Sequence, residues 1–253
     1  LAGWSTAGIY AYALAHALRE AGGDVTKCRP GDHVILSWIK GSGANVPGAV
    51  YAWNGKPVNA GGVTTFSRHA VVSENRITVI PASFDLRSAA LVGCAVPTGV
   101  GSVFNTGNVQ PGQSVAVFGT GGIGLCAVSA AVIRGASKIV AVDVCGERLS
   151  AARTMGATET VDAATCDPVA RAFELCPGGG DVAVEASGRP AVMVQALQSV
   201  RSQGGTAVII GNARHGERIE FDPSLLNQGK RLMGTWGGDN VPDRDFPEYC
   251  TLI

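Results

Sequence analysis

Glycines between two apolar runs are the most informative residues of this chain. One run, Ser114-Val-Ala-Val-Phe, leads into a turn with glycines at 119, 121, 122 and 124; the second, Lys138-Ile-Val-Ala-Val, ends on Asp143. A G-x-G-x-x-G turn between a strand and a helix lets the backbone approach a pyrophosphate, and the helix N-terminus attracts the phosphates. Asp143 follows Gly124 by 19 residues, near the interval of about 20 expected for an acid that binds an adenosine ribose. The spacing therefore predicts a dinucleotide-binding site.

The glycines have separate roles in this interpretation. Gly119 permits the tight turn out of the strand, Gly121 removes a Cβ that would obstruct a pyrophosphate, and Gly124 lets the helix pack close to the sheet. An ordinary strand–turn–helix is the alternative, because 35 of the 253 residues are glycine; the strand before the turn and the acid after it favour the dinucleotide site. The predicted cofactor-binding residues are Gly119, Gly121, Gly122, Ile123, Gly124, Asp143, Arg148, Ile210 and Gly211.

The acid at 143 favours NAD(H) over NADP(H). A carboxylate accepts hydrogen bonds from two ribose hydroxyls, whereas a 2′-phosphate would meet like charge at close range. Arg148, five residues later, argues in the opposite direction, since a nearby cation could accommodate that phosphate.

Composition excludes several classes of partner. Apolar residues make up 46% of the chain and charged residues 16%, which is typical of a well-buried α/β protein. Twenty basic and twenty acidic residues cancel, so we expect neither a nucleic-acid nor a membrane partner. The seven cysteines are scattered without a C-x-x-C pair, which predicts reduced thiols and a cytoplasmic protein. Because the chain opens on Leu1 and stops on Ile253, we expect a fragment that lacks both ends.

From Ser114 onward, strand and helix patterns alternate, which predicts a parallel sheet covered on both faces. This is the doubly wound, Rossmann-type α/β class, and we assign it to residues 97–236. After Asp143 the expected helices are 147–155, 168–175 and 191–200, and the expected strands are 159–161, 181–185, 206–210 and 231–234.

The first 96 residues have a different sequence pattern, with short strand-like runs between turns, and this pattern predicts a smaller, β-rich domain. Strands are expected at 34–38 and 63–72, with a Gly/Pro/Asn-rich loop over 41–62 and an alanine-rich helix over 5–21. The predicted organisation is thus a catalytic domain at 1–96, a dinucleotide-binding domain at 97–236 and a return to the first domain at 237–253.

Three segments carry a family resemblance. Lys27-Cys-Arg-Pro-Gly-Asp-His-Val34, Leu91-Val-Gly-Cys-Ala-Val-Pro-Thr-Gly99 and Val109 to Gly124 resemble the medium-chain dehydrogenase/reductase superfamily, in particular its zinc-type alcohol dehydrogenases. The resemblance implies a partial N-terminal GroES-like β-barrel, a Rossmann domain that binds NAD(P), hydride transfer between a small alcohol and a carbonyl compound, and a homodimer in the full-length protein.

The same resemblance suggests roles for individual residues. It implies that Cys94 is a catalytic zinc ligand, that Thr98 faces the nicotinamide, and that Arg148 lies near the adenosine ribose or phosphates. A thiolate is a good zinc ligand, but a single cysteine in an apolar run is also commonly a small buried hydrophobe. Both interpretations of Cys94 remain open at this stage.

The chain departs from the family at its metal ligands. The first cysteine ligand would precede Leu1, and the place of the histidine ligand holds Ala11-Tyr12-Ala13; nearby His16 matches a glycine. No cysteine lies between Cys28 and Cys94, where the family has four closely spaced cysteines. The sequence thus predicts no structural zinc and at most a catalytic one.

Three functions remain for this chain. The first is an NAD-dependent alcohol or polyol dehydrogenase that uses zinc. The second is a zinc-independent reductase of the same superfamily, and the third is a dinucleotide-binding chain without catalysis. Metal content separates the first from the second, and turnover separates both from the third.

Overall fold

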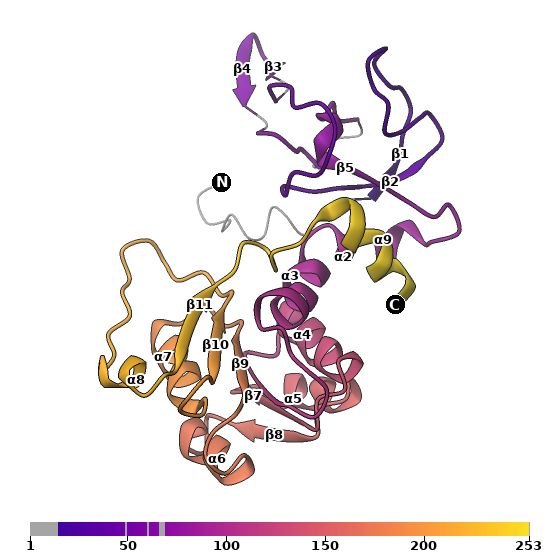
Figure 1. Cartoon of the computed structure of the whole chain (residues 1–253). Helices are drawn as coiled ribbons and strands as arrows, with labels where there is room; N and C mark the ends of the chain where they lie inside the picture. Colours follow the sequence, from indigo (N-terminus) through magenta and orange to yellow (C-terminus); the bar gives the residue numbers. More distant parts are fainter. Residues whose placement is uncertain (1–14, 49, 60, 66–68, 253) are drawn as a thin grey trace. The chain divides into compact units, whose positions relative to one another are not determined.

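The computed structural model describes residues 15–48, 50–59, 61–65 and 69–252, and the chain divides into two compact units. Unit 1 contains Leu1–Pro97 and Asn240–Ile253, and unit 2 contains Thr98–Asp239. Figure 1 shows their elements, and each unit is described by itself.

Unit 2 is built on a six-stranded parallel sheet. The strands lie in the order β8-β7-β6-β9-β10-β11, so the order reverses between β6 and β9, and both pair with each other along their length. This is the 3-2-1-4-5-6 order of doubly wound dinucleotide-binding folds, and it confirms the predicted class. The strand bounds are β6 Ser114–Phe118, β7 Lys138–Asp143, β8 Glu159–Asp162, β9 Val182–Glu185, β10 Thr206–Ile209 and β11 Arg231–Gly234.

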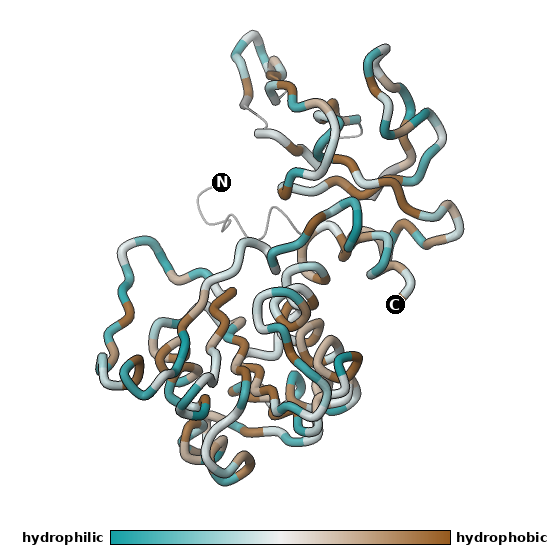
Figure 2. Tube along the Cα trace, in the orientation of Figure 1, coloured by the Kyte–Doolittle hydropathy of each residue, from teal (hydrophilic) through white to brown (hydrophobic). Residues whose placement is uncertain are grey.

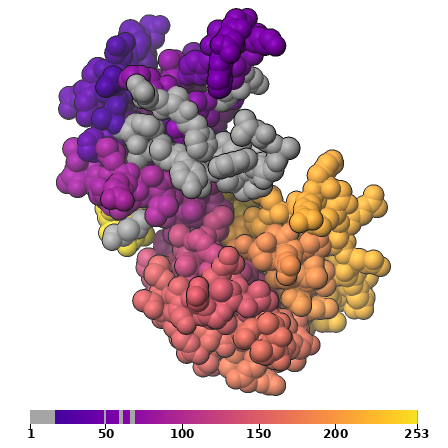
Figure 3. All heavy atoms as spheres, turned by 180° about the vertical axis from the view of Figure 1, so that it is seen from behind, coloured from indigo at the N-terminus to yellow at the C-terminus, as the bar shows by residue number. Residues whose placement is uncertain are grey.

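Helices cover both faces of this sheet. On one face α4 packs against β6 and β7 and against α5; on the other, α6 and α7 pack against each other and the sheet. In the view from behind, the segments from α4 to α6, coloured rose to salmon, form a continuous surface (Figure 3). The helices are α4 Gly122–Ile133, α5 Gly146–Thr154, α6 Pro168–Leu175, α7 Pro190–Ser199 and the short α8 Ser224–Asn227.

The central strands are apolar because both of their faces are buried. All four residues of β9 are buried, as are four of the five in β6, which is typical of parallel strands. Phe118 of β6 and Leu197 of α7 belong to one core cluster and are fully buried. The hydropathy-coloured tube shows these strands as a concentration of brown segments (Figure 2).

Unit 1 contains a small antiparallel sheet in the order β1-β2-β5 and a separate two-stranded hairpin. Its core cluster is formed by Val34, Leu36 and Ile77. Helix α9 packs against β5 and α2, so the C-terminal segment belongs to this unit. The strands are β1 Ala15–Ala17, β2 His33–Leu36, β3 Val50–Trp53, β4 Lys56–Asn59 and β5 Ile77–Ile80; the helices are η1 Glu74–Arg76, α2 Leu86–Val92 and α9 Pro242–Leu252.

Helix α3 (Ala95–Gly101) spans the boundary between the units and continues in unit 2 as the π-helix η2 (Ser102–Thr106). No single helix of the described part of the chain is both long and apolar enough to cross a membrane. The consecutive helices at 86–92 and 95–106 reach that length and composition only together, across a bend.

Two sequence expectations for unit 1 are wrong where the structure describes them. Within the expected helix 5–21, Ala15–Ala17 is a strand that pairs with β2; residues 1–14 lie outside the described residues. Helix propensity is a weak preference, and strand pairing overrides it here. Within the expected strand 63–72, residues 63–65 and 69–72 are in neither helix nor strand. Strand β2 pairs with β1 on one side and with β5 (Ile77–Ile80) on the other. Neither side of β2 is therefore left for the segment at 63–72.

The expected loop 41–62 contains a hairpin that the sequence analysis missed. Strands β3 and β4 are joined by Asn54 and Gly55, both with positive φ, at 51° and 71°. An Asn-Gly pair between strands is a strong hairpin signal, because the two-residue type I′ turn needs positive φ at both positions. The signal was present in the sequence as Trp53-Asn-Gly-Lys56.

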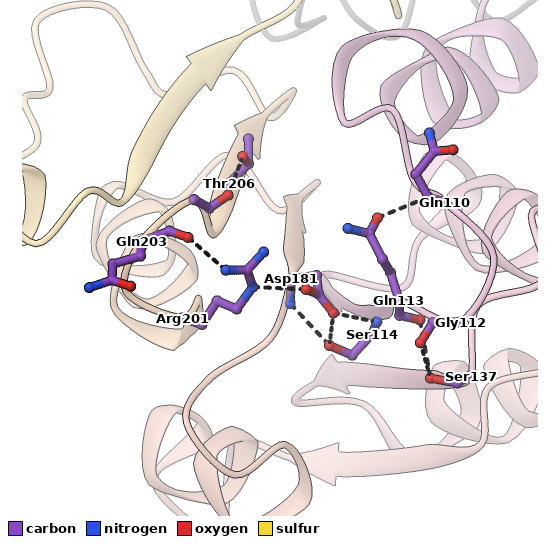
Figure 4. Close-up of polar contacts among 10 residues, drawn as sticks. Gln110, Gly112, Gln113, Ser114, Ser137, Asp181, Arg201, Gln203 and Thr206 are labelled. Carbon is purple, nitrogen blue, oxygen red and sulfur yellow. Dashed lines mark hydrogen bonds and ion pairs between the residues drawn. The ribbon is translucent and has the colours of Figure 1, made fainter.

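A polar cluster joins the amino ends of the central strands of unit 2 (Figure 4). The Asp181 carboxylate accepts hydrogen bonds from Ser114 N and Ser114 Oγ, both at 2.9 Å, and from Arg201 Nε at 2.8 Å. Burial acts to raise the pKa of Asp181, but these hydrogen bonds and the Arg201 charge outweigh it, and the pKa is lowered. The ionised carboxylate therefore connects β6 to the loop before β10.

We expect Asp181→Asn to destabilise the fold by about 1–3 kcal/mol, because it removes charge-assisted hydrogen bonds from a partly buried group. The folded-state pKa is below the unfolded one, so this contribution is present above the unfolded value of about 3.9 and lost as pH falls through the folded value. Urea unfolding at pH 7 and pH 3 would check it. An equal difference between parent and variant at both pH values would contradict this role for Asp181.

Candidate dinucleotide site

The turn between β6 and α4 has the geometry that its glycines predict. Gly119 has a φ of 89°, and its N–H donates to Val142 O at 2.8 Å, which brings the turn against the end of β7. A Cβ on Gly119 would lie 2.9 Å from Ser187 N. Both the left-handed φ and this close approach require glycine.

Gly121 and Gly124 differ in what surrounds them. A Cβ on Gly124 would lie 1.9 Å from Gly119 O, whereas a Cβ on Gly121 would meet nothing within 4 Å. Gly124 is thus required by the packing of α4 against the strand end, and Gly121 faces open space. Helix α4 begins at Gly122 without a side chain that caps it, so its first turn is suited to bind an anion.

Asp143 ends β7 beside this turn and organises the backbone around it. Its Oδ2 accepts from Thr120 N at 2.7 Å, and its Oδ1 accepts from Val144 N at 2.8 Å and Cys145 N at 3.0 Å. The side chain is 5% exposed, and Arg148 Nη1 lies 3.9 Å from Oδ2. The carboxylate therefore holds both the glycine turn and the start of α5, a role beyond the predicted contact with a ribose.

A cavity of about 310 Å³ opens beside these residues. It brings together four of the predicted residues, Gly119, Gly121, Asp143 and Arg148. Its opposite wall follows β9 and is formed by residues that the sequence analysis did not single out, Ala186, Ser187, Arg189, Val192 and Gln195. The strand and helix flanking this wall were predicted, but no motif in these residues marked them as the wall that faces the glycine turn.

The other predicted cofactor residues lie around the same strand ends. Gly122, Ile123 and Gly124 form the first turn of α4. Ile210 and Gly211 follow β10, and their N–H groups both donate to Glu185 O at 3.0 Å. Ligands of open α/β sheets bind at the carboxyl ends of strands where the strand order reverses, which is where these segments lie.

Thr98 and Cys94 are not among the residues that line this cavity. Thr98 lies within α3, and Cys94 lies between α2 and α3, packed against the core cluster of unit 1. Burial raises the pKa of the Cys94 thiol, while a hydrogen bond with Trp38 opposes that change.

The described residues do not fit a zinc ion. Among them, no three His, Cys, Asp or Glu side chains are grouped so that they could hold a metal. The histidine position of the family falls at Ala11-Tyr12-Ala13, outside the described residues. We therefore derive no catalytic step through zinc.

The remaining cysteines are free thiols, and one that is partly buried lies in α4, just after the glycine turn. None of the seven cysteines, all of which lie in the described part of the chain, forms a disulfide bond. Burial raises the pKa of Cys126, in α4, to about 11, so this thiol is protonated at neutral pH and acts as a small packing residue.

A second hollow, of about 760 Å³, lies along α6 and α7 and shares Ala163 and Gln195 with the first. It contains none of the predicted site residues. Lys230 lines it and donates to Gln198 O at 2.6 Å, and burial lowers the pKa of this lysine. Because Gln198 is near the C-terminus of α7, where helix carbonyls attract a cation, the position of Lys230 is explained without a ligand.

Comparisons with known proteins agree with this geometry. A family model described as "Zinc-binding dehydrogenase" matches residues 122–253. The S-(hydroxymethyl)glutathione dehydrogenase of Saccharomyces cerevisiae is 33% identical, over 94% of this chain and 71% of the relative. A class-3 alcohol dehydrogenase of Pisum sativum is 32% identical, over 94% of this chain and 72% of the relative.

Solved structures with this fold show the same likeness. An alcohol dehydrogenase zinc-binding domain protein from Burkholderia ambifaria is 31% identical with a TM-score of 0.82. Benzyl alcohol dehydrogenase from Acinetobacter calcoaceticus is 28% identical, also with a TM-score of 0.82. In both, the match covers 94% of this chain and 71% of the other.

We predict that Gly121→Val abolishes dinucleotide binding while the chain stays folded, because the new side chain enters open space that the ligand would use. Gly124→Val should instead disrupt the fold, since its Cβ would collide with Gly119 O. Circular dichroism and titration with NADH, followed by nicotinamide fluorescence, distinguish the two. A Gly121→Val chain that binds NADH as tightly as the parent would show that this turn does not contact the ligand.

Proposed function

The chain belongs to the zinc-binding dehydrogenase family, and on that premise we propose that it transfers a hydride between a small alcohol or carbonyl compound and NAD(H). The observation that carries the proposal is the cavity between the Gly119–Gly124 turn and the wall at 186–189, with Asp143 at its edge. The oxidoreductase class follows from the relatives, which are alcohol and S-(hydroxymethyl)glutathione dehydrogenases.

The residues of unit 2 would divide the binding of the dinucleotide between them. The first turn of α4 supplies uncapped N–H groups for a pyrophosphate, and Gly121 leaves the space that such a group needs. Asp143 would accept hydrogen bonds from the adenosine ribose, and Arg148 and Arg189 line the same cavity. When bound, the nicotinamide ring supplies the hydride acceptor or donor.

The remaining assignments belong to the same proposal. We place Thr98 on the nicotinamide side, assign Ile210 and Gly211 to cofactor binding and keep Cys94 as the candidate metal ligand. Residues 1–96 and 237–253 would form the catalytic part and residues 97–236 the dinucleotide-binding part. We also propose a homodimer for the full-length protein and a cytoplasmic location, which is supported by the absence of disulfide bonds among the described cysteines.

A panel of primary, secondary and polyhydric alcohols, with NADH formation followed at 340 nm, tests the reaction. Turnover with any of them supports the dehydrogenase, and turnover without metal supports the zinc-independent reductase. Tight NADH binding without turnover in either direction would favour the third function, a dinucleotide-binding chain without catalysis.

We expect NAD(H) to bind at least about tenfold more tightly than NADP(H), because a 2′-phosphate would meet the Asp143 carboxylate, and tenfold corresponds to about 1.4 kcal/mol. Asp143→Ser should narrow that ratio. The substitution should also weaken the binding of both cofactors, because Thr120, Val144 and Cys145 each donate a backbone hydrogen bond to this carboxylate. Calorimetric titration with both oxidised cofactors is the measurement, and tighter NADP⁺ binding by the parent chain would contradict the assignment.

We expect the chain to hold well under one zinc per molecule after dialysis against a chelator. Cys94 is the one residue with family support as a ligand, whereas a catalytic zinc needs three protein ligands. Elemental analysis of the parent and of Cys94→Ala measures this. One tightly held zinc that is lost in Cys94→Ala would disprove the expectation, and His16 would then be the first residue to examine as a second ligand.

A further inference from the structure

A fully buried carboxyl group lies at the point where the strand order of unit 2 reverses. Glu185 is the last residue of β9, pairs in register with Phe118 of β6, and is 0% exposed. Charged residues are rarely buried completely unless they are paired, and no ion pair to Glu185 occurs in the described part of the chain. Its place in the core therefore needs a physical reason.

One oxygen of this carboxyl group organises the cavity wall that follows β9. Glu185 Oε1 accepts hydrogen bonds from Ser187 N at 2.7 Å, from Ser187 Oγ at 2.5 Å and from Gly188 N at 2.9 Å. These donors belong to the turn between Ala186 and Arg189, whose residues line the cavity. The acid thus sets the path of the backbone along this wall.

The same residue is bonded to the turn that follows β10. Its backbone carbonyl accepts from Ile210 N and Gly211 N. A Cβ on Gly211 would lie 2.2 Å from Gly188 N and 2.6 Å from Glu185 Oε2. The two turns therefore pack against each other with the carboxyl group directly beneath them.

The second oxygen of this carboxyl group lowers the stability that the group contributes. Glu185 Oε2 is buried and has no hydrogen-bond partner among the described residues. A buried polar atom without a partner costs free energy, which an apolar side chain of similar volume would avoid. Acceptance of the three donors in the cavity wall is the compensating feature that the structure shows.

We propose that Glu185 is a positioning residue of the dinucleotide site. Its carboxyl group holds the 186–189 wall in the shape that receives the adenosine end of the cofactor and couples that wall to the 210–211 turn. The wall lies next to the glycine turn, since Ala186 N donates to Phe118 O at 2.8 Å and Ser187 N lies close to Gly119. This inference rests on the proposed dinucleotide binding.

Two conservative variants of Glu185 separate the effect of side-chain length from the effect of charge. Glu185→Gln keeps the length of the side chain and an oxygen that can accept from Ser187 and Gly188, but it loses the charge. Glu185→Asp keeps the charge, but its carboxylate is one methylene short of those donors. AMP, which carries the adenosine end without the nicotinamide, is the probe, used on the full chain by calorimetric titration.

We expect Glu185→Asp to bind AMP at least about tenfold more weakly than the parent, and Glu185→Gln to stay within about threefold, because only the first loses the wall-forming acceptor. Thermal unfolding is measured in parallel. The control is Glu74→Gln, which alters a buried carboxylate of unit 1 that accepts from Thr26 N, Lys27 N and Ala44 N. That variant should unfold at a lower temperature and bind AMP like the parent.

The outcomes are distinct. A parent chain that binds neither NADH nor AMP overturns the proposed function, and this inference falls with it. A parent that binds both, with Glu185→Asp equally tight, overturns only the role of Glu185. If Glu185→Gln bound AMP as weakly as Glu185→Asp does, the proposal that an acceptor oxygen at this position shapes the wall would be wrong. A loss of AMP affinity of the same size in Glu74→Gln would also contradict the proposal.

Discussion

The close approach of α4 to the end of β6 is the constraint on which unit 2 depends. Only a hydrogen atom fits between the Gly124 backbone and Gly119 O, because a Cβ there would lie 1.9 Å from that oxygen. The helix N-terminus is thereby held at the carboxyl edge of the sheet, where its free N–H groups and dipole favour an anion. The turn remains narrow because Gly119 adopts a φ of 89°. The proposed anion site is therefore a consequence of packing and needs no charged side chain in the turn.

Carboxylates then hold the segments around this edge by binding backbone N–H groups. Asp143 binds the N–H groups of Thr120, Val144 and Cys145, and Glu185 binds those of Ser187 and Gly188. At the other end of the strands, where β6 and β9 begin, the ionised Asp181 connects β6 to the loop before β10. In each case one acid satisfies several donors that strand and helix ends leave unpaired. The shape of the cavity is thus determined by side chains that lie beneath its walls as much as by those that line it.

Unit 1 uses the same device around the loop at residues 41–45. The Glu74 carboxylate accepts from Ala44 N, Thr26 N and Lys27 N, and these hydrogen bonds lower its pKa to about 2. Asp243 of α9 accepts from Ser42 N at 2.7 Å. Two carboxylates thereby connect the 41–45 loop to distant parts of the unit. Cys94, in contrast, packs against the apolar cluster of this unit, in surroundings that favour its protonated form.

The sequence by itself determined the class of unit 2 and most of its elements. Local patterns were sufficient for this: apolar runs of four to six residues mark buried parallel strands, and proline or glycine marks the helix ends, so that helix 168–175 and strand 231–234 have the predicted bounds. The glycine turn and Asp143 were also recognisable, because their roles depend on spacing along one strand–turn–helix segment. In unit 1 the same approach failed for 15–17, and for 63–65 and 69–72, because the formation of short strands depends on which segments pair with β2.

Tertiary structure decided what depends on neighbours far apart in the chain. The pairing of β9 with β6 places the 186–189 wall opposite Gly121, more than 60 positions away in the sequence, and no local pattern marks the residues that form this wall. The burial of Glu185 and the contacts of Asp143 with Thr120 likewise arise only when separate segments pack together. Backbone geometry and periodicity are local properties that a sequence displays directly, whereas strand order, burial and hydrogen-bond partners are properties of the packed chain.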